Sequence, residues 1–209
     1  MTLVLTIIAV FLILLTAEYL ARRTKMHPEL TRKFVHMAVG SFVAFWPFFL
    51  SWREIELLSA AFLIVILVSI KLTFFKSIHT TPKRAIGEIS FAVVIGLLAF
   101  LSGSKWIFMA AMLNLAIGDA MAAITGLLWG EKNQYKVFGK TKSVVGTSVF
   151  FVVSLLIMVL YINLSKDTAN VTALFLVPLL ATATENVATH GTDNLIMPVL
   201  IALLLSSTA

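Results

Sequence analysis

The sequence contains no cysteine and few charged residues. Because none of its 209 residues is cysteine, disulfides, thiolate metal sites and cysteine nucleophiles are all excluded. Charged residues make up 12% of the chain and hydrophobic residues 60%, whereas soluble domains average about 25% and about 45–50%. This composition excludes an ordinary soluble fold.

Long apolar runs occupy most of the chain. Eight spans of about 20 residues would use about 160 residues, which leaves room only for termini and loops. We therefore predict an all-α, polytopic bundle of about eight transmembrane helices, with residues 1–209 forming a single membrane-embedded domain. The predicted spans are about 2–20, 34–50, 55–72, 87–102, 105–129, 144–164, 170–187 and 194–208.

Basic residues are concentrated in alternate loops. The net charge is +6, and the loops after the first, third and fifth spans carry all of the 16 Lys and Arg residues except Arg53, Lys105 and Lys166. The positive-inside rule places these loops in the cytoplasm and both termini outside. Topology thus accounts for the basic charge, and we predict no nucleic-acid partner.

Four carboxylates lie at or near membrane depth in the cytoplasmic half of the predicted bundle: Glu88, Asp119, Glu185 and Asp193. Burial of a carboxylate in a membrane is costly, so such residues are candidates for function. Asp119 is the strongest candidate because it lies well inside the fifth apolar run. The structural alternative for Asp119 is an ion pair with a lysine.

A stripe of small side chains follows the same segment at a four-residue period: Gly118, Ala122, Gly126 and Gly130. Such stripes allow a second helix to approach closely. We expect this stripe to serve helix packing and also to leave room for a nucleotide beside Asp119.

Residues 130–150 combine lysines, hydroxyls and glycines at the entrance of a predicted helix, a pattern that suits phosphate binding. The residues that we predict to contact phosphate are Lys140, Lys142, Ser143 and Gly146. Gly139-Lys140-Thr141 is similar to the end of a Walker A loop. However, Gln134 stands where that motif needs glycine, and a membrane helix is predicted where it needs a strand. A P-loop is therefore excluded.

Residues 183–198 place four polar side chains between two apolar runs: Glu185, His190, Asp193 and Asn194. Carboxylate and amide oxygens without thiols suit a hard cation such as Mg²⁺, which often shares substrate phosphates. A helix cap at Asp193 is the alternative.

A fourth polar group lies near the N-terminus, where Glu29, Arg32, Lys33 and His36 have spacings of three and four. These spacings place them on one face of a helix that enters the membrane. The alternative is an interfacial turn with snorkelling bases.

Taken in order, these segments resemble the CTP-dependent lipid kinase family, which includes dolichol, phytol and diacylglycerol kinases. The matching motifs are E-x-x-R-K-x-x-H (Glu29 to His36), Gly87-Glu88 with Phe91, G-D-A-x-A-x-x-x-G-x-x-x-G (Gly118 to Gly130), Lys142-Ser143-x-x-Gly146-Thr147, and Glu185, Asp193-Asn194 and Pro198. The resemblance covers about residues 29–198.

This family is related to phosphatidate cytidylyltransferase. Residues 190–193 are similar to part of that enzyme's H-G-G-x-x-D-R-x-D signature, but Asn194 replaces the arginine and the second aspartate is missing. These departures favour a kinase over a cytidylyltransferase.

We therefore predict an enzyme that phosphorylates a polyprenol-, dolichol- or phytol-type alcohol, with CTP as the donor implied by the resemblance. Phosphoryl transfer needs positioning and charge neutralisation, so we expect Asp119 and Asp193 to hold Mg²⁺ with support from Glu185 and Asn194. Glu88 is the predicted base, because it lies at a helix start near the interface. The predicted nucleotide and phosphate ligands are Arg32, Lys33, His36, Gly126, Lys140, Lys142, Ser143, Gly146 and Asn194.

Two alternatives stay open: cytidylyl transfer that yields a CDP-lipid, and a non-enzymatic transporter whose buried acids mark an ion pathway. We expect an integral membrane protein with its site facing the cytoplasm, in the cell membrane of a prokaryote or an ER-type membrane of a eukaryote. The expected partners are a lipid alcohol, a nucleoside triphosphate and membrane lipids, and a homodimer is left open.

Overall fold

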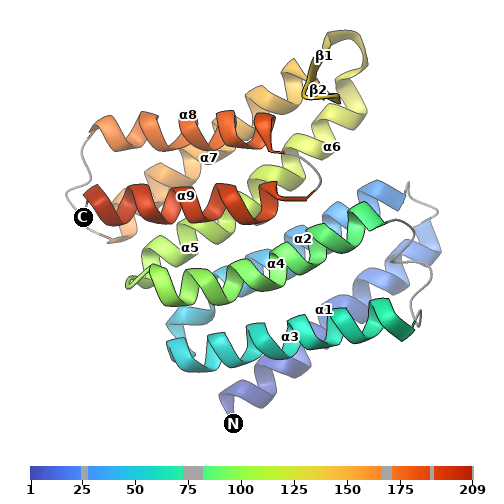
Figure 1. Cartoon of the computed structure of the whole chain (residues 1–209), viewed down its shortest axis with the longest axis vertical. Coiled ribbons are helices and arrows are strands. Elements are labelled where there is room, and N and C mark those ends of the chain that lie inside the picture. The colour runs from blue at the N-terminus through green and yellow to red at the C-terminus, as the bar shows by residue number, and fades with distance from the viewer. Residues whose placement is uncertain (25–27, 73–81, 166–170, 189–190, 209) are drawn as a thin grey trace.

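The computed structural model describes residues 1–24, 28–72, 82–165, 171–188 and 191–208 (Figure 1). Within these ranges the chain is helical apart from short connections and one hairpin. The elements are α1 (Thr2–Thr24), α2 (Pro28–Ala44), η1 (Trp46–Phe48), α3 (Trp52–Leu72), α4 (Pro82–Leu101), α5 (Lys105–Leu113), η2 (Asn114–Gly118), α6 (Asp119–Trp129), η3 (Glu131–Asn133), β1 (Gln134–Val137), β2 (Lys140–Ser143), α7 (Val144–Ser165), α8 (Val171–Val187) and α9 (Asp193–Thr208).

Each of the eight predicted apolar segments coincides with a helix, which confirms the all-α class. The segment predicted at 105–129 is one continuous helical run built from α5, the π-helical turn η2 and α6. α2 and α4 begin at Pro28 and Pro82, earlier than predicted, because a polar first turn extends each helix beyond its apolar part. Proline suits this position because the first residues of a helix need no N–H partner.

Two helices among the described residues are long and apolar enough to cross a membrane: Lys105–Trp129 and Val144–Ser165. Shorter apolar helical stretches cover Thr2–Ala17, Ile86–Leu101, Thr172–Val187 and Asp193–Ser207. These two helices fit membrane spans by length and composition, and the total of eight spans stays a prediction.

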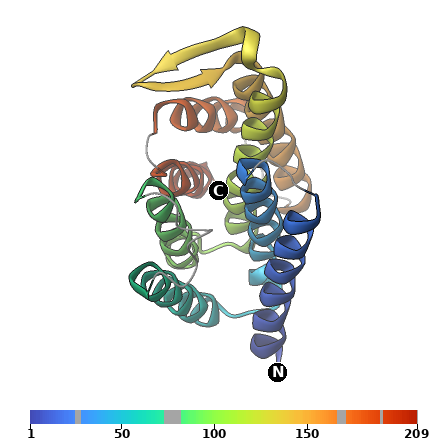
Figure 2. The ribbon, with the colours of Figure 1, turned by 90° about the vertical axis from the view of Figure 1, so that its right-hand side faces the viewer.

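The continuous run α5–η2–α6 forms the centre of the bundle. Its fully buried side chains include Phe108, Met112 and Leu115, which belong to a core shared with Phe150 and Met158 of α7. α2, α7 and α9 pack around the run. In Figure 2, α3, α4, α9 and α8 follow one another along one side of the molecule, and the central run lies on the other side with α1 and α2.

Residues 134–143 form a β-hairpin, whereas the sequence analysis predicted only a loop and a helix entrance here. β1 and β2 are antiparallel, with Tyr135 opposite Lys142 and Val137 opposite Lys140. The turn residues Phe138 and Gly139 have φ values of 46° and 76°, as in a two-residue type I′ turn. Figure 2 shows that the hairpin lies across one end of the bundle, over α8.

Candidate functional site

Three carboxylates from separate parts of the chain meet at one end of the bundle. Asp119 begins α6, Glu185 lies near the end of α8 and Asp193 begins α9. One oxygen of each side chain lies within 4.8 Å of the other two. The three acids predicted to bind metal are thus brought together.

Two lysines from other segments pair with this acid cluster. Lys33 Nζ on α2 donates to Asp119 Oδ2 at 2.5 Å. Lys142 Nζ on β2 donates to Glu185 Oε1 at 2.5 Å and to the Glu185 carbonyl oxygen at 2.8 Å. The ion pair that the sequence left as a structural alternative for Asp119 is therefore present, with Lys33 as the partner.

The two lysines do not provide hydrogen-bond partners for all of the carboxylate oxygens in the cluster. Glu185 Oε2 and Asp193 Oδ1 are buried oxygen atoms without a hydrogen-bond partner, and buried polar atoms in folded proteins usually have one. Three carboxylates also carry more negative charge than the two lysines offset. Buried oxygens with unused lone pairs are the ligands that a hard divalent cation prefers, so these residues fit Mg²⁺.

The pKa of Lys142 reflects this environment. Burial alone would lower the pKa of its ammonium group, but the Glu185 carboxylate, with Asp193 and Asp119 behind it, raises the pKa above its ordinary value. Lys142 is therefore a positively charged group that faces the acid cluster.

His36 and a π-helical turn flank Asp119. The turn η2 ends directly before Asp119, and π-turns occur frequently at functional sites. His36 Nε2 lies 3.2 Å from the Leu115 carbonyl oxygen and 3.7 Å from Asp119 Oδ2. His36 thus lies beside the cluster, whereas Arg32 is exposed and pairs with Glu29 at 2.5 Å. Contact of either side chain with a nucleotide stays a prediction.

The predicted phosphate ligands of the hairpin face α8. Lys140 Nζ donates to the Ala188 carbonyl oxygen at 3.4 Å, so Lys140 and Lys142 reach the same end of α8. Ser143 Oγ accepts the Gly146 N–H at 3.1 Å and so acts as the N-cap of α7. Contact of these side chains with phosphate stays a prediction.

The stripe of small residues packs against α7. A Cβ atom at position 146 would lie 2.8 Å from the Ala122 carbonyl oxygen and 3.5 Å from the Gly126 Cα atom. At Gly118, a Cβ atom would lie 3.2 Å from the Phe150 ring. The stripe therefore serves close helix packing, as expected, and room for a nucleotide beside Asp119 stays a prediction.

We expect Gly146→Ala to lower stability by about 1–3 kcal/mol, because the added methyl group must push α6 and α7 apart. Thermal unfolding of the detergent-solubilised protein would measure this loss. Val152→Ala, on the exposed face of the same helix, is the control and should unfold near the wild-type temperature. An unchanged unfolding temperature for Gly146→Ala would contradict the tight α6–α7 contact.

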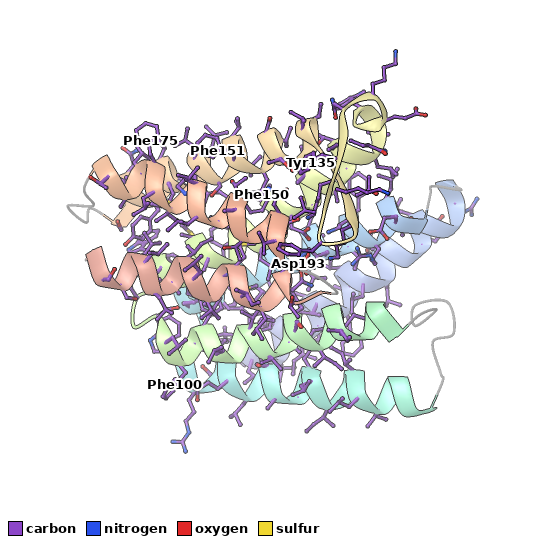
Figure 3. All side chains as sticks on the ribbon, turned by 45° about the horizontal axis from the view of Figure 1, so that its top comes forward. Phe100, Tyr135, Phe150, Phe151, Phe175 and Asp193 are labelled. Atoms are coloured by element: carbon purple, nitrogen blue, oxygen red, sulfur yellow. The ribbon has the colours of Figure 1, made fainter. Side chains whose placement is uncertain are left out.

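Three residues that hold the hairpin in place were not predicted as a group. Tyr135 Oη donates to Asn186 Oδ1 at 2.5 Å and contacts Thr147 Oγ1, which donates to the same Asn186 oxygen at 3.1 Å. Figure 3 shows Tyr135 and Asp193 near the middle of the view, where α9 begins, and Phe100 away from both. If the sequence had predicted the hairpin, its register would have placed Tyr135 opposite Lys142 and so close to the site.

The start of α4 reaches the site through two glycines. Asn194 Nδ2 donates to the Gly87 carbonyl oxygen at 3.0 Å. Gly191 has a φ of +87°, and a Cβ atom there would lie 2.7 Å from Gly87 backbone atoms. This contact brings the segment before Glu88 to the start of α9, and the role of Glu88 as the base stays a prediction. His190 lies outside the described residues.

Comparison with known proteins decides the family. A phytol kinase of Synechocystis sp. is 32% identical over 203 residues, which cover 92% of this chain and 84% of that protein. This chain belongs to the lipid kinase family of the polyprenol and phytol type. No protein-family model matches it, and no solved structure matches it.

Proposed function

We propose that the chain is a membrane-embedded enzyme that transfers the terminal phosphate of CTP to the hydroxyl group of a polyprenol-, dolichol- or phytol-type alcohol in the presence of Mg²⁺. One observation carries the proposal: three buried or half-buried carboxylates from separate segments converge within 4.8 Å in a chain related to a phytol kinase. The choice of CTP rests on the resemblance of the ordered motifs.

Asp119, Glu185 and Asp193 would hold Mg²⁺, which when bound neutralises phosphate charge. Lys33 and Lys142 already face these acids, so their ammonium groups are placed to offset the charge of an arriving triphosphate. In the reaction, the lipid hydroxyl oxygen bonds to the terminal phosphorus while the bond from that phosphorus to the bridging oxygen breaks. We assign acceptance of the hydroxyl proton to Glu88.

An open apolar cleft between the end of α8 and the first turns of α9 supports a lipid acceptor. It has a volume of about 280 Å³ and is lined by Ala183, Thr184, Val187, Ala188 and Ile196. Four of these residues lie within three positions of Glu185 in sequence, and Ile196 is three residues after Asp193 on α9. We propose that the lipid chain lies in this cleft with its hydroxyl end directed toward the carboxylates.

The outer surface supports the membrane setting. Large apolar side chains are exposed on several helices, among them Phe11 on α1, Ile64 on α3 and Leu156 on α7. In water such extended apolar surface would favour aggregation, whereas lipid chains would cover it. We propose eight spans with the acid cluster on the cytoplasmic side, where the nucleotide is available.

The test of this function is the fate of labelled CTP. Purified protein would be given Mg²⁺, CTP labelled in the γ- or α-phosphate, and separate acceptors: polyprenol, phytol, diacylglycerol and phosphatidate. We expect γ-label in the lipid product of polyprenol or phytol. Transfer of α-label would establish cytidylyl transfer instead, and the absence of any transfer, together with no thermal shift with CTP, would favour the transporter.

The cleft gives a separate prediction. We expect Ala183→Phe to fill it and raise KM for the lipid alcohol, while kcat and KM for the nucleotide change little, because uniform binding of the lipid chain is lost. Leu156→Phe, on the exposed face of α7, is the control. Equal effects of the two variants would show that the cleft does not bind the lipid chain.

A further inference from the structure

The turn of the hairpin holds a bulky aromatic residue in an unfavourable conformation. Phe138 has a φ of +46° and is 75% exposed. Two-residue type I′ turns prefer Asn-Gly or Asp-Gly, because short polar side chains tolerate a positive φ. A left-handed conformation is sterically unfavourable for other side chains. Neither turn geometry nor solubility in water therefore accounts for phenylalanine at this position.

Side chains of both strands fix the hairpin to the bundle and so determine where the turn lies. Tyr135 binds Asn186 and Lys142 binds Glu185, and Lys140 reaches the carbonyl oxygen of Ala188 directly after α8. Phe138 lies two residues before Lys140. The turn is therefore held beside the end of α8 and is not a freely placed loop.

The hairpin and the helix ends that adjoin it carry exposed side chains typical of a membrane interface. Trp129 ends α6 and is 67% exposed, and tryptophan is enriched where apolar helices leave the hydrocarbon region. Val187, at the end of α8, is also exposed. The exposed lysines Lys132 and Lys136 lie on the same connection as Phe138, so an apolar side chain and two positive charges are presented together.

We propose that the hairpin turn is a membrane-interface anchor: Phe138 inserts among the lipids of an anionic bilayer, and Lys132 and Lys136 contact the lipid headgroups. Aromatic insertion combined with basic residues is the chemistry by which proteins bind anionic membrane surfaces. The insertion of Phe138 rests on the membrane setting proposed above, and its effect on lipid use rests on the proposed reaction as well. The anchor would hold Lys140 and Lys142 at the depth where a lipid hydroxyl enters the site.

The absence of cysteine makes a direct test simple, because one introduced cysteine gives one labelled position. A nitroxide label would be placed at Phe138→Cys, at Gln134→Cys on the exposed side of β1, and at Leu156→Cys on the apolar outer face of α7. The full chain would be reconstituted in phosphatidylcholine vesicles with and without phosphatidylglycerol. Oxygen, which concentrates in lipid, and a water-soluble nickel chelate would then compete to relax each label.

The expected result is that oxygen relaxes labels 138 and 156 more strongly than the nickel chelate does, with the reverse order at 134. Label 138 should also lose nickel accessibility when phosphatidylglycerol is added. A label at 138 that resembles 134 while 156 reports lipid would overturn the anchor alone. Insertion that is independent of phosphatidylglycerol would overturn the role of anionic lipid, and water exposure at 156 would overturn the membrane setting as well.

A second variant separates anchoring from turn stability. Phe138→Asn should fit the turn better and so leave the thermal unfolding temperature unchanged or higher. It should raise KM for the lipid alcohol in phosphatidylglycerol-containing vesicles but not in detergent micelles. A lower unfolding temperature, or equal kinetics in vesicles, would show that Phe138 has a structural role and no contact with the membrane.

Discussion

Asp119→Asn is expected to lower kcat by about 100-fold or more. The substitution keeps the size of the side chain but removes the charge that would offset a divalent cation, and losses of about 10–100-fold are known even for residues that only support metal ligands. Steady-state kinetics with labelled CTP would measure the change. We expect the loss to appear mainly in kcat, because the interaction is needed when charge develops in the transition state.

The structure adds a stability effect to this prediction. Asp119→Asn leaves the buried ammonium group of Lys33 without its partner, and breaking a buried ion pair typically costs about 3–5 kcal/mol. Asp119→Asn/Lys33→Met removes both charges and should recover much of the lost stability without recovering activity. A well-folded double variant with wild-type activity would show that Asp119 is only the structural partner of Lys33.

Lys142→Ala is expected to lower kcat/KM for the nucleotide by about 10–100-fold. A hydrogen bond to a charged group contributes about 1.5–3 kcal/mol, and a phosphate-binding lysine acts in both the ground state and the transition state. Both KM and kcat should therefore change.

The matched control for Lys142→Ala is Thr141→Ala, since Thr141 is the exposed neighbour on the same strand. This variant should retain wild-type kinetics. Wild-type affinity for CTP in a folded Lys142→Ala protein would show that Lys142 only neutralises Glu185.

Much of the fold was predictable because its causes are local. Apolar runs of membrane length predicted eight segments, and each coincides with a helix. The hairpin was not predictable in this way, because its strands have four residues each and are held by contacts with α8. Without those contacts, a segment as polar as 130–143 is typical of a loop.

The carboxylates of the site were predictable for a different reason. An acid such as Asp119 in an apolar run is costly, so its presence indicates function, and the alternation of basic loops placed Asp193 at the same end. The partners of these acids could not be predicted. Lys33 lies 86 residues from Asp119 in sequence, and no spacing rule connects residues so far apart.

Binding of Mn²⁺, a spectroscopic substitute for Mg²⁺, directly tests whether Asp119, Glu185 and Asp193 form a metal site. Electron paramagnetic resonance would measure free and bound Mn²⁺ in the detergent-solubilised protein with CTP, for the wild type and for Asp119→Asn, Glu185→Gln and Asp193→Asn, each checked for folding. We expect the wild type to bind the ion and each substitution to weaken binding about 10-fold or more. Equal binding by the wild type and the three folded variants would contradict a metal site formed by this acid cluster.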